Sequence, residues 1–266
     1  MASFAERVAR RFKPDAAESA FLTSLEASLA RMHRGELIAR DGEQAHHAFV
    51  LRHGWAMSFT RFPDGSFQVR RLHFPGDLLA MPSLAMRHYT EDIEALSDCE
   101  IAIFPKSALA EVFRLPRLAA ILYMFAQAER VTLGDRLASL GHNRGNARIA
   151  FLLIDILRRL RSADPSVGCS FDMHLTREQV AHVTGMTPVH ASRMWSDLIA
   201  KGLISCVGHQ VTILAEDHLA QIAHYFDRDR DLDLDWLRIV EQRTTLVGER
   251  VGIGNCPPGG PNEKSI

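Results

Sequence analysis

The sequence predicts an α+β protein in which an antiparallel β roll, a long helix and a winged helix-turn-helix follow one another along the chain. Three observations predict this order. Between about residues 34 and 104, short runs of alternating apolar residues are separated by turn sequences. This pattern is typical of an antiparallel β barrel or jelly roll. From residue 116 to residue 140, apolar residues recur at helical spacing. Residues 175–204 then form two short helical patterns, and a hairpin pattern follows them.

The first half of the chain contains one helical pattern and four clear strand patterns. Residues 15–32 carry apolar residues at helical spacing, so we expect an amphipathic helix there. We expect strands in the runs 47–54, 55–62, 67–74 and 99–104. Asp64-Gly65 is the clearest hairpin tip because this pair suits a tight turn with positive φ.

The long helix is predicted to begin at Pro116, where the missing N–H of proline costs nothing. Pro105 and Ser107 predict a shorter helix before it. The long helix is apolar on more than one side, so it needs two partners to cover it. A helix buried within one chain and a helix shared by two subunits both fit this pattern. Residues 141–145 then predict a hinge, and Asn146 can cap a further apolar helix.

The helix-turn-helix pattern lies between residues 175 and 204. Thr176 and Gln179 have the spacing of a capping box. Gly185 suits the turn, and Thr187 followed by Pro188 predicts the start of the second helix. Alternating apolar residues around Gly208 then predict a two-stranded wing. A further helix is expected from residue 215, and another over residues 232–247.

Composition limits the possible functions. The net charge is −1 with histidine neutral, so any nucleic-acid contact must come from a local patch such as Arg177, Arg193, Lys201 and His209. No apolar run reaches membrane-spanning length and no secretory signal is visible, so we expect a cytoplasmic protein without a membrane partner. The four cysteines are far apart, which favours reduced thiols. No nucleophile elbow, P-loop or zinc motif is present, which disfavours an enzyme.

Several of these motifs resemble the Crp/Fnr family of transcription regulators. The resemblance covers roughly residues 20–226 and is carried by Leu-Thr-Arg-Glu at 175–178, Lys-Gly-Leu-Ile at 201–204 and Phe-Pro-Gly-Asp at 74–77. It implies three parts: a β-roll sensor domain like a cyclic nucleotide-binding domain with an N-terminal helix (1–115), a dimerisation helix (116–141) and a winged helix DNA-binding domain (142–228). It says nothing about residues 229–266, which we expect to form a partly disordered extension because their end is rich in glycine and proline. In this family the long helix packs on the same helix of a second subunit. The residues expected on that helix face are Leu118, Ile121, Leu122, Phe125 and Thr132.

The resemblance also implies a candidate effector pocket, formed by Gly76, Asp77, Leu78, Arg87 and Tyr89. Family members that bind cyclic AMP hold its ribose with a glutamate and its phosphate with an arginine. Here Asp77 stands at the glutamate position, Tyr89 stands at the arginine position, and Arg87 lies two residues earlier. A buried cyclic phosphate would lose its bidentate cation, which disfavours cyclic nucleotide binding.

Other cofactors of the family are disfavoured in the same way. No cysteine precedes Cys99, which excludes the iron–sulfur cluster of the oxygen-sensing branch on ligand count. Ala80 and Pro82 stand where the carbon-monoxide sensor has its haem ligands. The histidines between residues 46 and 88 match no recognised metal-ligand motif. We therefore predict no metal and no cofactor, and the effector stays open.

Ten residues are predicted to contact DNA: Thr176, Arg177, Thr187, Pro188, Val189, His190, Ser192, Arg193, Lys201 and His209. By resemblance, Arg193 reads a guanine edge and Ser192 reaches a base or a thymine methyl group. Thr176 and Arg177 suit a phosphate at a helix N-terminus. Val189 departs from the family, which has a glutamate there to accept from a cytosine. We therefore expect a half-site that differs from the family's at that base pair.

These observations predict a homodimeric regulator that binds double-stranded DNA with a two-fold symmetric operator under the control of the roll. RNA polymerase would be a further partner if the protein activates transcription. The alternative is a ligand-binding or protein-interaction module whose winged helix docks a protein partner, which the near-neutral net charge keeps open.

Overall fold

The computed structural model describes residues 3–228 and 232. Residues 3–228 belong to one compact unit. The expected extension over 229–266 and the helix predicted over 232–247 lie outside the described residues, apart from Leu232.

Two short helices precede the roll, α1 (Phe4–Arg11) and α2 (Ala16–Ser24). Each begins with a capping box, formed by Ser3 with Glu6 and by Asp15 with Glu18. The helix expected over 15–32 is shorter than predicted, because Leu29–Met32 form strand β1 and pair with β8 (Cys99–Pro105). The backbone hydrogen bonds of that pairing decide the conformation of a stretch whose local spacing also suits a helix.

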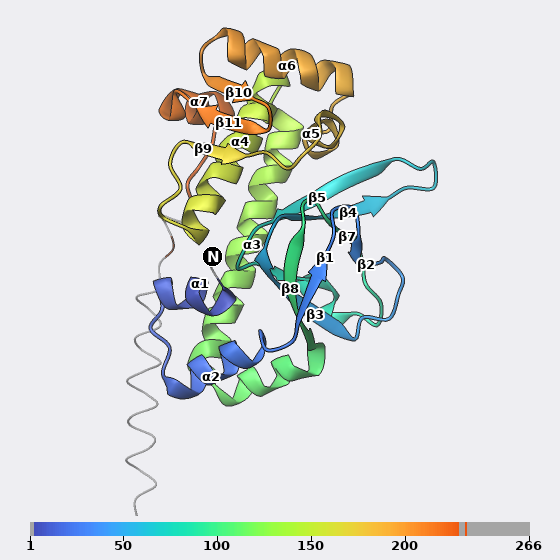
Figure 1. The fold of residues 1–266 in the computed structure, drawn as a ribbon, viewed down its shortest axis with the longest axis vertical. Coiled ribbons are helices and arrows are strands. Elements are labelled where there is room, and N and C mark those ends of the chain that lie inside the picture. The colour runs from blue at the N-terminus through green and yellow to red at the C-terminus, as the bar shows by residue number, and fades with distance from the viewer. Residues whose placement is uncertain (1–2, 229–231, 233–266) are drawn as a thin grey trace, which may run out of the picture. The chain divides into compact units, whose positions relative to one another are not determined.

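The roll consists of two four-stranded antiparallel sheets (Figure 1). One sheet has the order β1-β8-β3-β6 and the other has the order β2-β7-β4-β5. The remaining strands are β2 (Leu37–Ala39), β3 (His47–His53), β4 (Ala56–Arg61), β5 (Phe67–His73), β6 (Leu78–Leu79) and β7 (Asp92–Ala95). The 3-10 helices η1 (Met81–Ala85) and η2 (Lys106–Arg114) complete it. The four predicted strand runs correspond to β3, β4, β5 and β8.

Two glycines of the roll, Gly54 and Gly65, both have left-handed backbone, but an added side chain would clash with neighbouring atoms at only one of them. Gly54, after β3, has φ +84°, and an added Cβ would lie 2.4 Å from the Asp98 carbonyl oxygen. Gly65, at the β4–β5 hairpin tip, has φ +83° and nothing within 4 Å of an added Cβ. Both alanine substitutions carry the left-handed backbone cost of about 1–2 kcal/mol.

We expect Gly54→Ala to lower the free energy of unfolding by about 1–3 kcal/mol more than Gly65→Ala, because only the first also forces atoms apart. Urea denaturation of the two variants checks this difference. Equal losses would contradict the geometry at Gly54.

The long helix α3 spans Pro116–His142, and α4 spans Gly145–Ala163. Pro116 stands at the first helical position as predicted. The predicted hinge is shorter than expected, because α3 continues to His142. Asn146 does not cap α4, because the cap residue is Arg144. The side-chain amide of Asn146 instead donates to the Asp197 carboxylate at 3.2 Å.

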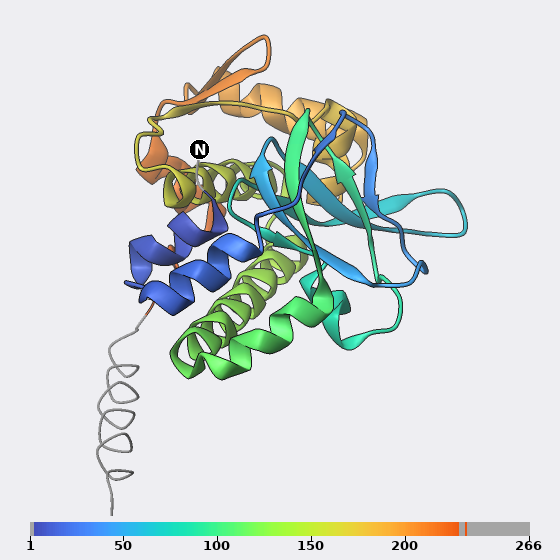
Figure 2. The same ribbon diagram turned by 60° about the horizontal axis from the view of Figure 1, so that its bottom comes forward.

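The winged-helix domain comprises α4, β9 (Ser170–Asp172), α5 (Arg177–Thr184), α6 (Pro188–Ala200), β10 (Ile204–Val207), β11 (Gln210–Ile213) and α7 (Glu216–Ala223). Its three strands form one sheet in the order β10-β11-β9. The β10–β11 hairpin is the predicted wing and extends away from the helices (Figure 2). Gly208, at its tip, has φ +60°.

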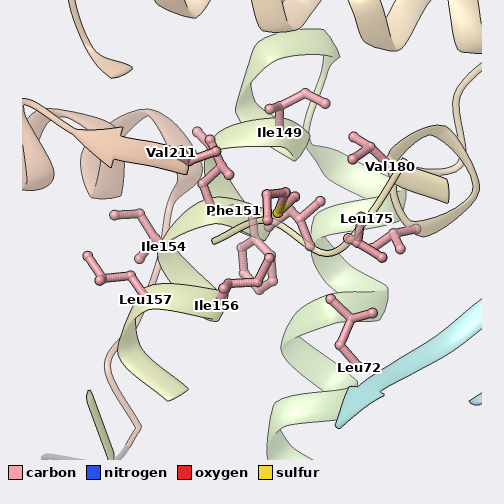
Figure 3. Close-up of a cluster of buried hydrophobic side chains, with 14 of the residues drawn as sticks. Leu72, Ile149, Phe151, Ile154, Ile156, Leu157, Leu175, Val180 and Val211 are labelled. Atoms are coloured by element: carbon pink, nitrogen blue, oxygen red, sulfur yellow. The ribbon is translucent and has the colours of Figure 1, made fainter. Parts of the chain in front are cut away.

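One hydrophobic core runs from the roll into the winged-helix domain. It joins Trp55, Met57 and Phe59 on one sheet of the roll to the buried face of α4. Figure 3 shows Leu72 of β5 beside the cluster that includes Phe151 and Leu175. Because these apolar side chains share one core, the two parts of the chain are packed as one body.

Candidate nucleic-acid interface and its link to the roll

The local sequence positions both helices of the helix-turn-helix. The Thr176 hydroxyl accepts from the Gln179 N–H at 3.1 Å, and the Gln179 side chain accepts from the Thr176 N–H at 2.8 Å. Gly185 ends α5 with φ +61°, which a residue with a side chain rarely adopts. Thr187 caps α6 through the His190 N–H. The predicted capping box and both predicted helix starts are confirmed.

Helix α6 has one buried side and one exposed side. Ala191, Trp195 and Leu198 are buried against the domain core. Val189 is 81% exposed, and Ser192 and Arg193 are exposed beside it. Within the described part of the chain, the Arg193 side chain has no hydrogen-bond or ion-pair partner. The N-terminal half of α6 therefore presents a cation, a hydroxyl and an apolar side chain on one free face.

The other residues predicted to contact DNA surround this face. Arg177 lies with its guanidinium 4.0 Å from the centroid of the Trp195 ring, so a buried ring of α6 holds it at the N-terminus of α5. Lys201 pairs with Asp197 at 2.7 Å. His209 is exposed at the wing tip, and His190 is half-buried. The exposed side chain of Val207 on the wing was not predicted; an apolar residue next to a hairpin-tip glycine was its only sign in the sequence.

A second polar site links the roll to the helices. Asp77, just before β6, is 2% exposed. Its carboxylate forms ion pairs with Arg7 of α1, Arg71 of β5 and Arg159 of α4, the last at 2.6 Å. We call these four residues the Asp77 cluster. Burial alone would raise the pKa of Asp77, but the charges of the three arginines outweigh that effect and hold its pKa far below the usual range.

Arg159 makes this cluster a direct connection between the two domains. It donates to the Leu72 carbonyl oxygen at 2.7 Å and lies 4.6 Å from the centroid of the Phe74 ring. Positive charges at the C-terminal end of a helix such as α4 also interact favourably with the helix dipole, and α4 has several arginines there. The structure shows that one of them carries the winged-helix domain's contact to Asp77.

Comparisons with known proteins agree with this architecture. The model of the cyclic nucleotide-binding domain matches residues 29–115, and the model of the Crp-like helix-turn-helix domain matches residues 147–222. The chain belongs to the Crp/Fnr family of transcription regulators. The transcriptional activator protein Anr of Pseudomonas aeruginosa is 24% identical over 193 residues, which are 72% of this chain and 79% of that protein.

Two further proteins are similar along most of the chain. The fumarate and nitrate reduction regulatory protein of Escherichia coli K12 is 23% identical over 195 residues, which are 72% of this chain and 77% of that protein. The structure of FixK2 from Bradyrhizobium japonicum has the same fold, with a TM-score of 0.68 at 21% identity over 75% of this chain and 98% of that chain. By name, Anr is a transcriptional activator and the Escherichia coli relative is a regulatory protein. Among the helices that the structure describes, none has the length and apolar character needed to cross a membrane.

The residues of the expected effector pocket differ in their surroundings in this chain. Gly76, Asp77 and Leu78 line a cavity that faces the helices. Tyr89 is instead buried in the apolar interior of the roll, where its hydroxyl donates to the His47 carbonyl oxygen at 3.0 Å. Arg87 is exposed. The arginines around Asp77 and the packing around Tyr89 give these two residues different surroundings, and the effector pocket stays a prediction.

Two of the five residues expected on the dimer face are interior in this protomer. Leu118 and Ile121 are 0% and 1% exposed because they pack within the same protomer. Leu122, Phe125 and Thr132 are half-buried on that side of α3. The exposed apolar residues of α3 include Tyr123 and Leu137 on the opposite side. The sequence showed that α3 is apolar on two sides, but only the fold shows which side is covered within its own protomer.

Proposed function

We propose that this Crp/Fnr protein is a homodimeric, sequence-specific DNA-binding regulator in which the roll controls operator binding. The observation that carries the proposal is the free face of α6, where Val189, Ser192 and the unpaired Arg193 are exposed together. Arginine can donate two parallel hydrogen bonds to a guanine edge, and an exposed valine can pack on a thymine methyl group. This face has the size and chemistry that the major groove reads.

The exposed side of α3 supports a dimer. Tyr123, Arg130 and Leu137 follow one another at intervals of seven residues, the repeat of a parallel coiled coil. Gly134 is exposed on the same side, and nothing lies within 4 Å of an added Cβ there. A second copy of α3 could therefore approach closely along this side. Two subunits related by a two-fold axis would present two α6 helices to a palindromic operator.

Contacts between the domains support control by the roll. Gln68 of β5 donates to the His182 carbonyl oxygen of α5 at 2.7 Å, and the rings of Phe67 and His182 stack with their centroids 4.0 Å apart. The Asp77 cluster adds a charged contact to α4. A signal that changes these contacts would change the position of α6, and thus the balance between DNA-binding states.

The proposal is tested by selecting DNA from random duplexes with the purified full-length protein. The expected result is enrichment of a palindrome whose half-sites lie about one helical turn apart. Failure to enrich any palindrome, both with and without cell extract, would refute the proposed function.

The dimer is tested by substituting Leu137→Glu. The variant should weaken self-association by at least about 2 kcal/mol, because each subunit loses an apolar contact and two carboxylates then face each other. Sedimentation equilibrium measures the change. Phe113→Glu is the matched control, since Phe113 is 81% exposed but lies on η2 and not on this side of α3. If both variants remained fully dimeric, a different surface would have to form the dimer.

A further inference from the structure

A second cavity, of about 230 Å³, adjoins the helix-turn-helix, and none of the five residues expected in the effector pocket lines it. Its wall comes from β5 of the roll, from α3 and α4, and from the C-terminal end of α5. Val183 and Thr184 of α5 belong to this wall and directly precede the Gly185 turn. Any molecule inside would therefore contact the roll, the long helix and the helix-turn-helix at once.

Much of this wall is apolar. Leu140 of α3, Phe151 of α4 and Val183 of α5 contribute to it. Leu137 also belongs to the wall and is 72% exposed, so a small molecule can reach the cavity from solvent at this edge. An apolar cavity of roughly 150 Å³ accommodates one benzene molecule. A space about half as large again fits two fused rings.

The polar side chains of the wall have hydrogen-bond partners within the protein, with one exception. The Gln68 amide, three arginines and the hydroxyl groups of Ser139 and Thr184 each form such a bond. Asp155 of α4 is 4% exposed, yet among the described residues its carboxyl group has no hydrogen-bond or ion-pair partner. Burial takes away hydrogen bonds that water would supply, so a donor beside Asp155 would be favourable.

The charges around Asp155 favour an uncharged donor. Arg70, one of the three arginines of the wall, pairs with Glu91 at 3.7 Å. The other two, Arg136 and Arg148, donate to backbone carbonyl oxygens and would repel a cation. Burial lowers the pKa of Arg136 and the negative charge of Asp155 opposes that change, so the two groups are within electrostatic reach without forming an ion pair. An anion would in turn be repelled by Asp155 itself.

We propose that this cavity binds a small uncharged aromatic molecule of about two rings, whose N–H or O–H group donates to Asp155. The apolar wall takes the rings, and the single free acceptor fixes their orientation. Binding itself does not depend on the proposed function, whereas an effect on operator choice rests on it. Because the occupant contacts α5 directly, it would favour one position of α5 relative to the roll.

The test uses indole as the probe and benzofuran as its counterpart of the same shape, in which an oxygen replaces the N–H. Titration calorimetry on the full-length, DNA-free protein should show one indole bound per chain, at least about tenfold tighter than benzofuran, because only indole donates to Asp155. Asp155→Leu removes the acceptor at similar side-chain size, so this variant should bind indole no tighter than benzofuran. Asp217→Leu is the control, since Asp217 is exposed on α7 outside the wall and should leave both affinities unchanged.

The position of the rings is tested with crystals of the unsubstituted protein soaked in indole. The indole nitrogen should lie within about 3.2 Å of an Asp155 carboxyl oxygen, with the rings beside Phe151. A cavity that holds only water, equal binding of indole and benzofuran, or a preference that survives in Asp155→Leu would each overturn the inference. A protein that selects a palindrome but binds no indole retains the proposed function and loses only this site, and one that binds indole but selects no palindrome retains only the site.

Discussion

Replacing Asp77 by asparagine will lower the free energy of unfolding by about 3–5 kcal/mol, the usual cost of removing one partner from a buried ion pair. The loss is large because Asp77 is 2% exposed and compensates three arginines. Urea denaturation at neutral pH measures it. Glu111→Gln makes the same change of charge in the exposed pair of Glu111 with Arg114, and should cost less than about 1 kcal/mol. Similar losses in the two variants would show that the Asp77 cluster contributes no more than a surface ion pair.

The same carboxylate predicts a dependence of stability on pH. The pKa of Asp77 is far lower in the folded protein than the value of about 3.9 expected in the unfolded chain. Its contribution is therefore complete above the unfolded pKa and is lost progressively as the pH falls below it. The unfolding free energy of Asp77→Asn should fall less steeply between about pH 4 and pH 2 than that of the unsubstituted protein. Parallel curves would contradict the assignment.

Replacing Arg193 by alanine will remove the preference for one base pair in each half-site and weaken operator binding by about 1–3 kcal/mol per half-site. The reason is that Arg193 is the exposed, unpaired cation on the free face of α6. Selection from random duplexes, followed by titration of the enriched site, measures both effects. Arg177→Ala is the matched comparison, because Arg177 lies at the N-terminus of α5 and is expected to contact phosphate.

The two arginine variants should differ in kind. Arg177→Ala should weaken all sequences alike and reduce the salt dependence, whereas Arg193→Ala should change the selected sequence. A third variant is Val189→Glu. The new glutamate can accept a hydrogen bond from a cytosine amino group. The preference at the base pair that residue 189 contacts should therefore shift to a cytosine–guanine pair. If all three variants selected the same operator, α6 would not be the helix that reads it.

Local sequence determined the helix-turn-helix of this protein. Thr176 with Gln179, the Gly185 turn, and Thr187 with Pro188 specify helix ends through contacts within a few residues, and the structure has each of them where the sequence predicted. The strands of the roll were predictable for the same reason, since alternation and turn residues are local. The exposed positions of Val189, Ser192 and Arg193 follow from helical periodicity.

Only the tertiary structure decided which apolar side chains are buried and which charged residues, far apart in the sequence, form ion pairs. Leu29–Met32 became a strand because β8 lies beside it, and Leu118 and Ile121 became interior because the protomer covers their side of α3. Arg7, Arg71 and Arg159 are far apart along the chain, so no local pattern indicates that they converge on Asp77. Hydrogen bonds between neighbours determine helix ends, whereas burial and ion pairing depend on residues that folding alone brings together.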